Sequence, residues 1–285
     1  MRRAGFAASL LAIVAAAGAP TLAGSAAAAT TLLPVSHVIL ILEENHSQSE
    51  ITSTSMPYLV GLGNTYAHTT HYSYSGCGPS LPNYLALTSG GTQGKCGTDC
   101  GTSTSGCTVG AANIFQQATT AGKGWRELAQ SEGVPCNHSN NGAYVVHHAP
   151  PPFYTDISAT VCKASDLPLV TTAFPDVTQA YAFVTPDNAH NAHSASLSAA
   201  DAYLKAIIPQ IQARADYISG ATLIEVTFDE SGTVYTAFIR PGLSHKVLTL
   251  PYTHYSTLRL DEELLGFPLL GAAKTAPDLR TALGL

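Results

Sequence analysis

His37-Val-Ile-Leu-Ile-Leu42 is an apolar run that ends abruptly in the polar residues Glu43-Glu44-Asn45-His46. A strand buried on both faces has such a continuous apolar run, and ligands of open α/β sheets bind at the carboxyl ends of the strands. The run therefore predicts a central strand that delivers Glu44 and Asn45 to a functional edge. Because side chains alternate along a strand, we expect Glu43 to point away from Glu44 and to have a structural role.

The rest of the chain alternates strand-like and helix-like segments, which favours an α/β fold. Strand character is found at 36–43, 142–146, 180–185, 221–228 and 233–240. Helical character is found at 82–89, 111–121, 124–132, 196–218 and 254–265, and Pro209 is expected to kink or divide the fourth of these. We predict a single domain with a central, mostly parallel sheet flanked by helices.

The first residues have the pattern of an export signal. Met1-Arg2-Arg3 is a basic start, residues 4–18 are an apolar core, and Ser25-Ala-Ala-Ala-Ala29 is a small-residue cleavage zone. The apolar core is short for a membrane span, and no later stretch is long enough to cross a bilayer. We expect a signal peptide over 1–29, a functional domain over 30–285, and a secreted protein without stable membrane insertion.

The charge balance restricts the class of partner. The chain has 13 basic and 19 acidic residues, and loss of Arg2 and Arg3 with the signal leaves 11 against 19, or −8. This balance argues against nucleic acid as a partner. An anionic substrate would have to find its positive charge locally, and a bound metal ion can supply it.

The cysteines indicate disulfides. An even number in an exported chain, six in all, allows up to three bonds and 15 connectivities. Zinc is the alternative for Cys96-x3-Cys100-x6-Cys107, but the Gly/Thr/Ser-rich setting of 90–110 favours a cross-linked surface loop. We expect Cys136 to pair with Cys162. The other four cysteines, Cys77, Cys96, Cys100 and Cys107, are expected to pair among themselves. Residues 147–178 are Pro-rich and irregular, as in a lid or rim beside a site.

Polar residues lie at the ends of five of the predicted elements: three groups follow strands, and Ser80 and His254 precede helices. In a parallel sheet, the carboxyl ends of the strands converge on one edge. Each group by itself is also explained by helix caps or surface residues, and the coincidence of five is what points to a site. The groups are Glu44, Asn45 and His46; Ser80; Asp187, His190, Asn191 and His193; Asp229 and Glu230; and His254.

The same motifs, in this order, resemble the bacterial phosphoesterase family. The motifs are Glu44-Asn45-His46-Ser47, Pro79-Ser80-Leu-Pro-Asn83-Tyr84, Thr185-Pro186-Asp187 to His193, Asp201 to Leu204, Thr227 to Glu230, and His254-Tyr255-Ser256. That family contains secreted acid phosphatases and phospholipases C and is related to the alkaline phosphatase superfamily. The resemblance implies an alkaline phosphatase-like fold, here with disulfide-stapled loops.

The resemblance also implies roles for individual residues. Ser80 is expected to attack phosphorus and form a phosphoserine, with Asp187, His193 and His254 as further catalytic groups. The expected metal ligands are Glu44, Asn45, Ser80, Asp229 and Glu230, and the expected substrate-binding residues are Asn83, His148, His190 and Asn191. An all-oxygen ligand set favours a hard divalent cation such as Mg²⁺, Ca²⁺ or Mn²⁺.

Three positions depart from the family pattern. Gly78 stands where many members have a His before Pro-Ser. The segment His190-Asn-Ala-His-Ser194 lacks two carboxylates of the usual Asn-Asp-x-His-Asp run, and Asp229-Glu230 is followed by Ser231-Gly232. A missing carboxylate removes a base, a partner that orients a histidine, or an outer ligand, and Asp187 with His190 is the nearest compensation.

These observations lead to ranked hypotheses about function. The first is a secreted, metal-dependent acid phosphatase, expected to be monomeric and to act on a small phosphorylated substrate or a phospholipid head group. A phospholipase C-type phosphodiesterase is the alternative within the family, although the chain is short for one. An inactive member that binds a phosphorylated ligand is the third. A serine esterase is the last, and the chain lacks its Gly-x-Ser-x-Gly elbow.

Overall fold

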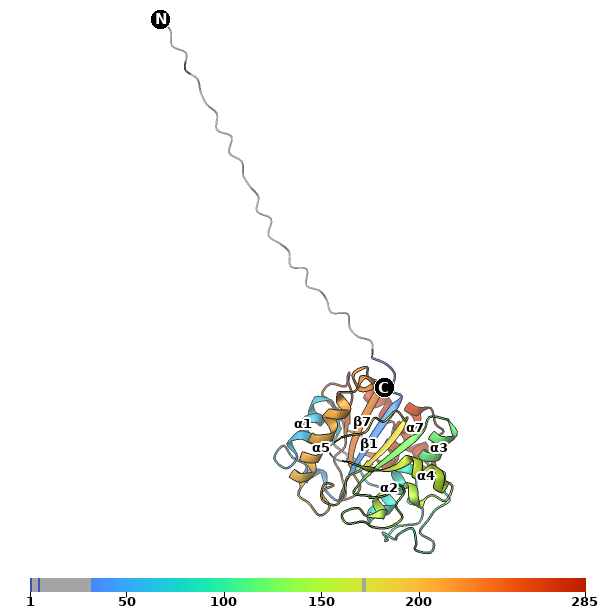
Figure 1. Cartoon of the computed structure of the whole chain (residues 1–285). Helices are drawn as coiled ribbons and strands as arrows, with labels where there is room; N and C mark the ends of the chain where they lie inside the picture. The colour runs from blue at the N-terminus through green and yellow to red at the C-terminus, as the bar shows by residue number, and fades with distance from the viewer. Residues whose placement is uncertain (2–4, 6–31, 171–172) are drawn as a thin grey trace. The chain divides into compact units, whose positions relative to one another are not determined.

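The centre of the molecule is an eight-stranded sheet, seen in a computed structural model that describes residues 1, 5, 32–170 and 173–285 (Figure 1). Its strands are β1 (His37–Glu43), β2 (Ala67–Thr69), β4 (Trp125–Gln130), β5 (Asp166–Leu169), β6 (Tyr181–Thr185), β7 (Thr222–Phe228), β8 (Ala237–Ile239) and β9 (Lys246–Leu248). Their order across the sheet is β5-β4-β6-β1-β7-β8-β2-β9. Two further strands, β3 (Tyr72–Ser73) and β10 (Tyr252–Thr253), form a separate parallel pair.

The strand β1 lies near the centre of the sheet, within its parallel part. It pairs in parallel with β6 on one side and with β7 on the other, while β8 runs antiparallel to its neighbours. The carboxyl ends of β1, β6 and β7 therefore lie at one edge. The residues that follow them are Glu44, Asp187 and Asp229, so the polar clusters at the strand ends are neighbours, as the sequence predicts.

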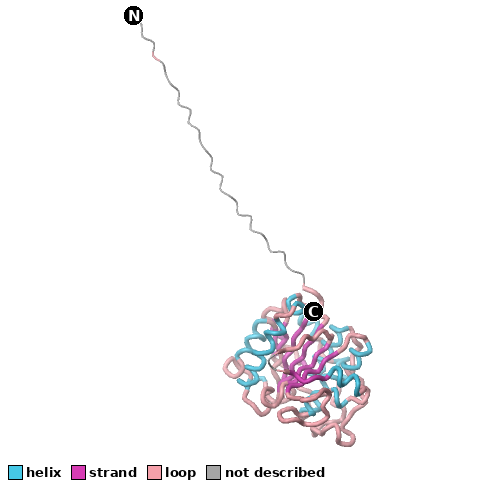
Figure 2. The backbone as a smooth tube through the Cα atoms, in the orientation of Figure 1, coloured by secondary structure: helices cyan, strands magenta, loops and turns pink. Residues whose placement is uncertain are grey.

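Helices cover both faces of the sheet (Figures 1 and 2). They are α1 (Pro57–Thr65), α2 (Ser80–Ser89), α3 (Ile114–Thr120), α4 (Ala159–Ser165), α5 (Leu197–Gln212), α6 (Ala215–Ile218), α7 (His254–Leu265) and α8 (Leu279–Leu283). The pair α1 and α5 packs on one face, and α2 packs with α7 on the other. Short 3₁₀ turns at Gln48–Glu50, Val146–His148, Pro151–Phe153 and Gly271–Thr275 complete the described elements.

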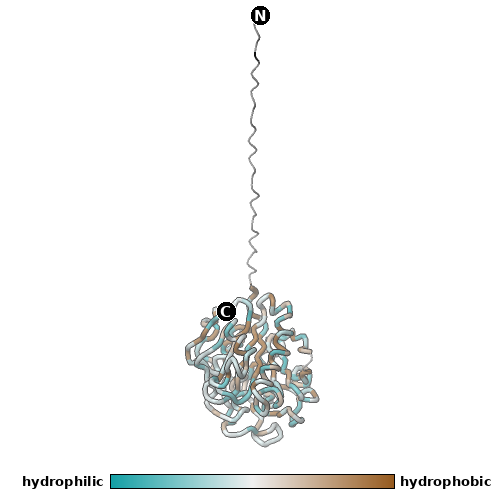
Figure 3. Tube along the Cα trace, turned by 90° about the vertical axis from the view of Figure 1, so that its left-hand side faces the viewer, coloured by the Kyte–Doolittle hydropathy of each residue, from teal (hydrophilic) through white to brown (hydrophobic). Residues whose placement is uncertain are grey.

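The apolar run of β1 is buried on both faces because helices lie on both sides of it. Val38 to Leu42 are at most 2% exposed, and apolar segments run through the middle of the domain (Figure 3). Alternation places Glu43 near Asp201 of α5, whereas Glu44 contacts Ser80 of α2 on the opposite face. The expected divergence of the two glutamates is confirmed.

Most of the predicted elements are confirmed. The strands β1, β6 and β7 and the helices α2, α3 and α7 occupy the predicted segments, and α7 has the predicted bounds. The fold is the α/β arrangement expected, with a mostly parallel central sheet. The predicted helix over 196–218 is divided into α5 and α6 between Gln212 and Ala215, while Pro209 lies inside α5.

Three predictions were wrong. Residues 124–132, expected to be helical, contain the strand β4, which is paired on both sides by β5 and β6. Residues 142–146 form no strand and contribute only a bridge between Asn141 and Tyr144. The strand expected over 233–240 is limited to β8, because its first residues pair with β3 instead: Thr233 bridges to Ser73, and the N–H of Val234 donates to the carbonyl of Tyr72 at 2.7 Å.

The disulfide predictions are confirmed. Cys136 pairs with Cys162, and the remaining bonds are Cys77–Cys96 and Cys100–Cys107. The predicted signal peptide falls outside the described residues apart from Met1 and Gly5. Among the helices that the structure does describe, none combines the length and the apolar character that a bilayer crossing requires.

Candidate active site

Ser80 and Glu44 meet at the carboxyl edge of the sheet. Ser80 is the first residue of α2, is 2% exposed, and donates its hydroxyl hydrogen to Glu44 Oε2 at 3.0 Å. Glu44 is held from two sides, because its N–H donates to the carbonyl of Asn191 at 2.8 Å and Tyr84 donates its hydroxyl to Oε1. The predicted nucleophile is therefore fixed against a buried carboxylate at a helix N-terminus.

Three further oxygen-bearing side chains lie next to this pair. Asn45 has a left-handed backbone (φ 51°), and its N–H donates to Asp229 Oδ1 at 2.9 Å. Its side-chain amide lies 3.1 Å from Asp229 Oδ1 and 3.0 Å from Glu230 Oε1. With its nitrogen toward them, the amide donates to both carboxylates. With its oxygen toward them, it joins a set of ligands suited to a hard cation.

These carboxylates are close together in a poorly solvated place. Burial, with the charge of Asp229, raises the pKa of Glu44 well above its ordinary value. Burial raises the pKa of Asp229 to about 6, and burial with the charge of Asp229 raises the pKa of Glu230 to about 7. No lysine or arginine of the described residues forms an ion pair with any of the three. Such a group is stabilised by protons or by a cation.

His148 and His193 lie on the other side of Glu44. His148 Nε2 is 3.4 Å from Glu44 Oε1, and the ring stacks on Tyr84 with centroids 5.2 Å apart. The ring of His193 is 6.0 Å from that of His148 and is exposed. Burial lowers the pKa of His148 well below its ordinary value. The structure thus brings both histidines to the site, His148 at its wall and His193 at its rim.

His254 does not lie where it could exchange a proton with a substrate at Ser80, although the sequence predicts such a role. It is buried at the start of α7, with Nε2 2.6 Å from the carbonyl oxygen of Asp229 and Nδ1 3.2 Å from the hydroxyl of Tyr72. Burial lowers its pKa to about 4. Both ring nitrogens have protein partners, so His254 fixes the backbone at Asp229 from behind.

Asp187, His190 and Asn191 form a bonded turn after β6. Asp187 Oδ1 lies 2.9 Å from His190 Nδ1, and its other oxygen accepts from Ser131 at 2.5 Å. The ring of His190 stacks on Tyr203. The Asn191 side chain accepts from the N–H of His193 at 2.9 Å, while its backbone carbonyl holds Glu44. The turn shapes the site through Asn191 and leaves His190 oriented by Asp187.

The side chain of Asn83 is bonded to the loop of residues 75–79, which leads into Ser80. Its Oδ1 accepts from the N–H and hydroxyl of Ser75 at 3.1 and 2.5 Å. Its Nδ2 donates to the carbonyls of Cys77 and Pro79 at 3.0 and 3.2 Å. The side chain is fully buried. Both its oxygen and its nitrogen are thus hydrogen-bonded to the loop before Ser80. Asn83 therefore positions this loop, whereas the sequence predicts that it contacts the substrate.

Three residues near the site were missed from the sequence. Tyr84 contacts Glu44, and its position one turn after Ser80 was the signal available, since residues i and i+4 share a helix face. Asp99 accepts from the N–H of Leu81 at 2.8 Å, and His147 Nε2 lies 3.7 Å from Asp99 Oδ2. No sequence pattern places Asp99 here, because it lies in a loop whose position depends on the disulfides.

Gly78 explains one departure from the family pattern. A Cβ atom at this position would lie 2.5 Å from Glu230 Oε2. The carboxylate of Glu230 therefore occupies the space into which a larger residue before Pro79 would extend. The glycine and the glutamate fit one another, and the oxygen set is retained where the family usually has a histidine.

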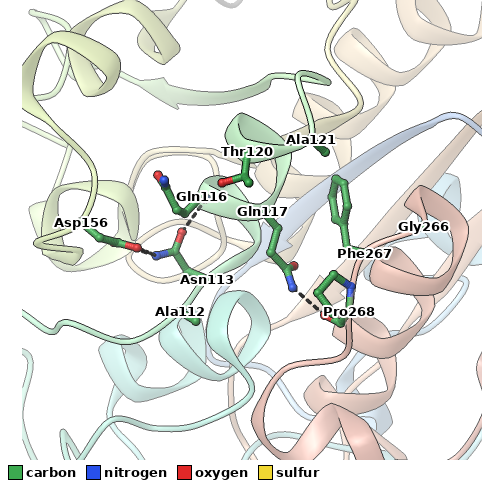
Figure 4. Close-up of a pocket in the computed structure, with 10 residues that line it drawn as sticks. All are labelled: Ala112, Asn113, Gln116, Gln117, Thr120, Ala121, Asp156, Gly266, Phe267 and Pro268. Atoms are coloured by element: carbon green, nitrogen blue, oxygen red, sulfur yellow. Dashed lines mark hydrogen bonds between the residues drawn. The ribbon is translucent and has the colours of Figure 1, made fainter.

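A separate surface pocket of about 290 Å³ lies away from this site (Figure 4). It is formed by α3 and the turn after α7, with Phe267 on one side and Gln117 donating to the carbonyl of Pro268. Asp156 accepts from Asn113 at its far end. None of the residues around Ser80 lines it.

The comparisons with known proteins show the family to which the chain belongs. A family model described as the phosphoesterase family matches residues 49–247. The chain belongs to the phosphoesterase family. This phosphoesterase is 28% identical over 266 residues to the phosphatidylinositol-3-phosphatase of Mycobacterium tuberculosis, with 87% of this chain and 83% of that protein covered.

Solved structures support the fold alone, because their sequence identities are low. A protein of the alkaline phosphatase superfamily from Vibrio parahaemolyticus has a TM-score of 0.58 at 10% identity, over 89% of this chain and 73% of its own. A 2-O GAG sulfatase has a TM-score of 0.59 at 11% identity, over 88% and 75%. A phosphonate monoester hydrolase from Silicibacter pomeroyi has a TM-score of 0.55 at 11% identity, over 87% and 76%. The alkaline phosphatase-like fold predicted from the sequence is confirmed.

Proposed function

We propose that this phosphoesterase is an exported, divalent-cation-dependent phosphomonoesterase of the acid phosphatase type with Ser80 as its nucleophile. One observation carries the proposal: the buried Ser80 hydroxyl donates to Glu44 at 3.0 Å, next to the oxygens of Asn45, Asp229 and Glu230. A serine in such a setting has a proton acceptor and a place for charge neutralisation, which are what phosphoryl transfer requires.

The residues present fit a hard cation. Asp229 Oδ2 is buried without a hydrogen-bond partner, so one of its oxygens is free to ligate. Glu44, Asn45 and Glu230 complete an oxygen set around Ser80, and Mg²⁺, Ca²⁺ and Mn²⁺ are the candidates. When bound, such an ion lowers the pKa of the serine hydroxyl and neutralises the phosphoryl oxygens.

The chain's own residues then account for the chemistry. Ser80 Oγ gives its proton to Glu44 and forms a bond to phosphorus, while the bond from phosphorus to the ester oxygen breaks. Water then attacks the phosphoserine, the Oγ–P bond breaks, and the Ser80 hydroxyl is restored with release of phosphate. His148 and His193 face this place from the other side of Glu44 and are proposed to hold phosphoryl oxygens.

The nature of these groups supports acid conditions and export. Among the described residues, the basic side chains at the site are the histidines His148 and His193, and a histidine holds a phosphoryl oxygen most strongly when it is protonated, which an acid medium favours. Three disulfides with no free cysteine suit an oxidising compartment. The name of the mycobacterial relative makes a phosphoinositide head group the first substrate to try.

The test is phosphate release from inositol 3-phosphate and from p-nitrophenyl phosphate by the mature protein, from pH 5 to 8, with and without Mg²⁺, Ca²⁺ or Mn²⁺. We expect chelator to abolish turnover and Ser80→Ala to reduce it by at least about 10³-fold. Ser89→Ala, on the last turn of the same helix, is the matched control and should leave turnover unchanged.

Asp229→Asn tests the role of the cation independently of that of Ser80. It should weaken cation binding by about 10- to 100-fold, measured by calorimetry, and excess cation should restore part of the activity. Turnover that persists in Ser80→Ala, or a wild type that binds cation and inositol 3-phosphate but releases no phosphate, would contradict the proposal.

A further inference from the structure

Asp99 is a carboxylate beside the nucleophile that the mechanism above does not use. Its Oδ1 accepts from the N–H of Leu81 at 2.8 Å, at the N-terminus of α2, and its Oδ2 lies 3.7 Å from His147 Nε2. The Asp99 side chain is 26% exposed and that of His147 is 20% exposed. Both groups therefore lie at the open side of the site.

The loop that carries Asp99 is fixed relative to Ser80. Asp99 lies between Cys96 and Cys100, and the Cys96 disulfide reaches Cys77, three residues before the nucleophile. The N–H of Gly97 also donates to the carbonyl of Gly78 at 2.7 Å. A covalent link and a backbone hydrogen bond thus hold the Asp99 loop to the segment that leads into Ser80.

His147 connects this loop to the reacting centre. Its ring meets that of His148 edge-on with centroids 4.6 Å apart, and His148 contacts Glu44 at 3.4 Å. Burial lowers the pKa of His147, and the charge of Asp99 opposes that shift. His147 is therefore one side chain removed from the Glu44–Ser80 pair and is paired with a carboxylate outside the oxygen set.

The approach of the substrate decides what His147 can contact. Ser80, Glu44 and Asp229 are at most 2% exposed, whereas Asp99 and His147 beside them are partly exposed. We therefore place the approach of the ester to Ser80 on the side of Asp99 and His147. In-line displacement places the leaving oxygen opposite the attacking one. The leaving alcohol consequently points outward, toward the histidine of the rim that has an acidic partner.

We infer that His147 protonates the leaving alcohol and that Asp99 is the positioning residue that orients it. The inference rests on the proposed function. As the bond from phosphorus to the ester oxygen breaks, the Nδ1 proton of the imidazolium passes to that oxygen and the alcohol departs, while Nε2 keeps its proton toward Asp99. In the second step, the water that attacks the phosphoserine returns a proton to His147.

The test compares two monoesters, p-nitrophenyl phosphate, whose leaving phenol is acidic, and glycerol 2-phosphate, whose leaving alcohol is not. An acid catalyst matters mainly for the poor leaving group. His147→Gln should lower kcat for glycerol 2-phosphate by about 10²- to 10³-fold and for p-nitrophenyl phosphate by less than about 5-fold. Asp99→Asn should show the same selectivity at about 10-fold, and its side-chain oxygen can still accept from Leu81.

The controls separate this inference from its premise. His71→Gln, an exposed histidine, should leave both rates unchanged. Melting temperatures should match the wild type, since a merely structural role lowers both rates together. Equal losses for the two esters, or no loss, would overturn the inference while Ser80-dependent turnover by the wild type keeps the proposed function. A wild type that hydrolyses neither ester overturns both.

Discussion

Asn83→Ala is the substitution that best distinguishes a positioning place from a substrate contact. The side chain makes four hydrogen bonds to the loop before Ser80, with Ser75 as donor and with the carbonyls of Cys77 and Pro79 as acceptors. Alanine removes all four and leaves the Ser75 N–H and the Cys77 carbonyl without this partner. The loop that leads into the nucleophile then loses its internal brace.

The magnitude follows from these contacts. Each intramolecular hydrogen bond contributes roughly 0.5–1.5 kcal/mol net, and buried groups left unpaired cost about 1–3 kcal/mol. Four bonds in a fully buried position give an expected loss of about 3 kcal/mol in the free energy of unfolding. For a domain of this size, that corresponds to a fall of roughly 6–12 °C in melting temperature. Displacement of Ser80 should also lower kcat by about 10²-fold with KM little changed.

The assay is urea unfolding with the disulfides intact, alongside kcat and KM for p-nitrophenyl phosphate. Asn83→Asp is a second test, because it keeps the acceptor for Ser75 but turns an oxygen toward two carbonyls, and it should be at least as destabilising. Asn64→Ala, an exposed asparagine in α1, is the matched control. An Asn83→Ala protein of wild-type stability whose KM alone rises would refute the reasoning and restore the substrate-binding role.

Two other substitutions test the surroundings of the site. Gly78→Ala should push the Glu230 carboxylate aside and weaken cation binding several-fold in calorimetry. The free energy of unfolding should change by less than about 1 kcal/mol, because the displaced atom ends a flexible side chain. Gly61→Ala is the control, since a Cβ atom there meets nothing within 4 Å. Glu225 and Asp261 form a buried carboxyl pair, and burial raises the pKa of Glu225 to about 8. The folded state therefore binds protons more tightly than the unfolded chain. Its free energy of unfolding is highest below about pH 4.5 and falls by up to about 1.4 kcal/mol per pH unit as pH rises from there to about 8. Glu225→Gln should flatten that slope in thermal melts, and an unchanged slope would contradict it.

The parts of the fold that could be predicted are those where local pattern and tertiary environment agree. The apolar runs of β1 and β7 lie where the sheet is covered on both faces, so burial and strand propensity point the same way. In β4 the local pattern and the tertiary environment disagree. Arg126 to Gln130 are good helix formers, and only pairing with β5 and β6 makes this segment a strand. That pairing is a long-range contact that no local window contains.

The candidate site divides in the same way. Glu44 and Asp229 follow adjacent strands, so the sheet brings them together without help from side chains, and their proximity could be predicted. The roles expected of Asn83 and His254 come from the family resemblance alone. These roles depend on which backbone groups surround the two side chains. The sequence does not show that Asn83 is hydrogen-bonded to loop 75–79 or that His254 is hydrogen-bonded to the Asp229 carbonyl.

The central place of β1 has a consequence for how this chain must be made. The strands that pair with β1 begin at Tyr181 and Thr222, so the most apolar segment of the domain leaves the ribosome long before either partner exists. Until then, both edges of Val38 to Leu42 are unpaired, and a short, uncharged, β-prone segment with open edges is a template for aggregation. Chains truncated before β7 should therefore aggregate while the full chain does not.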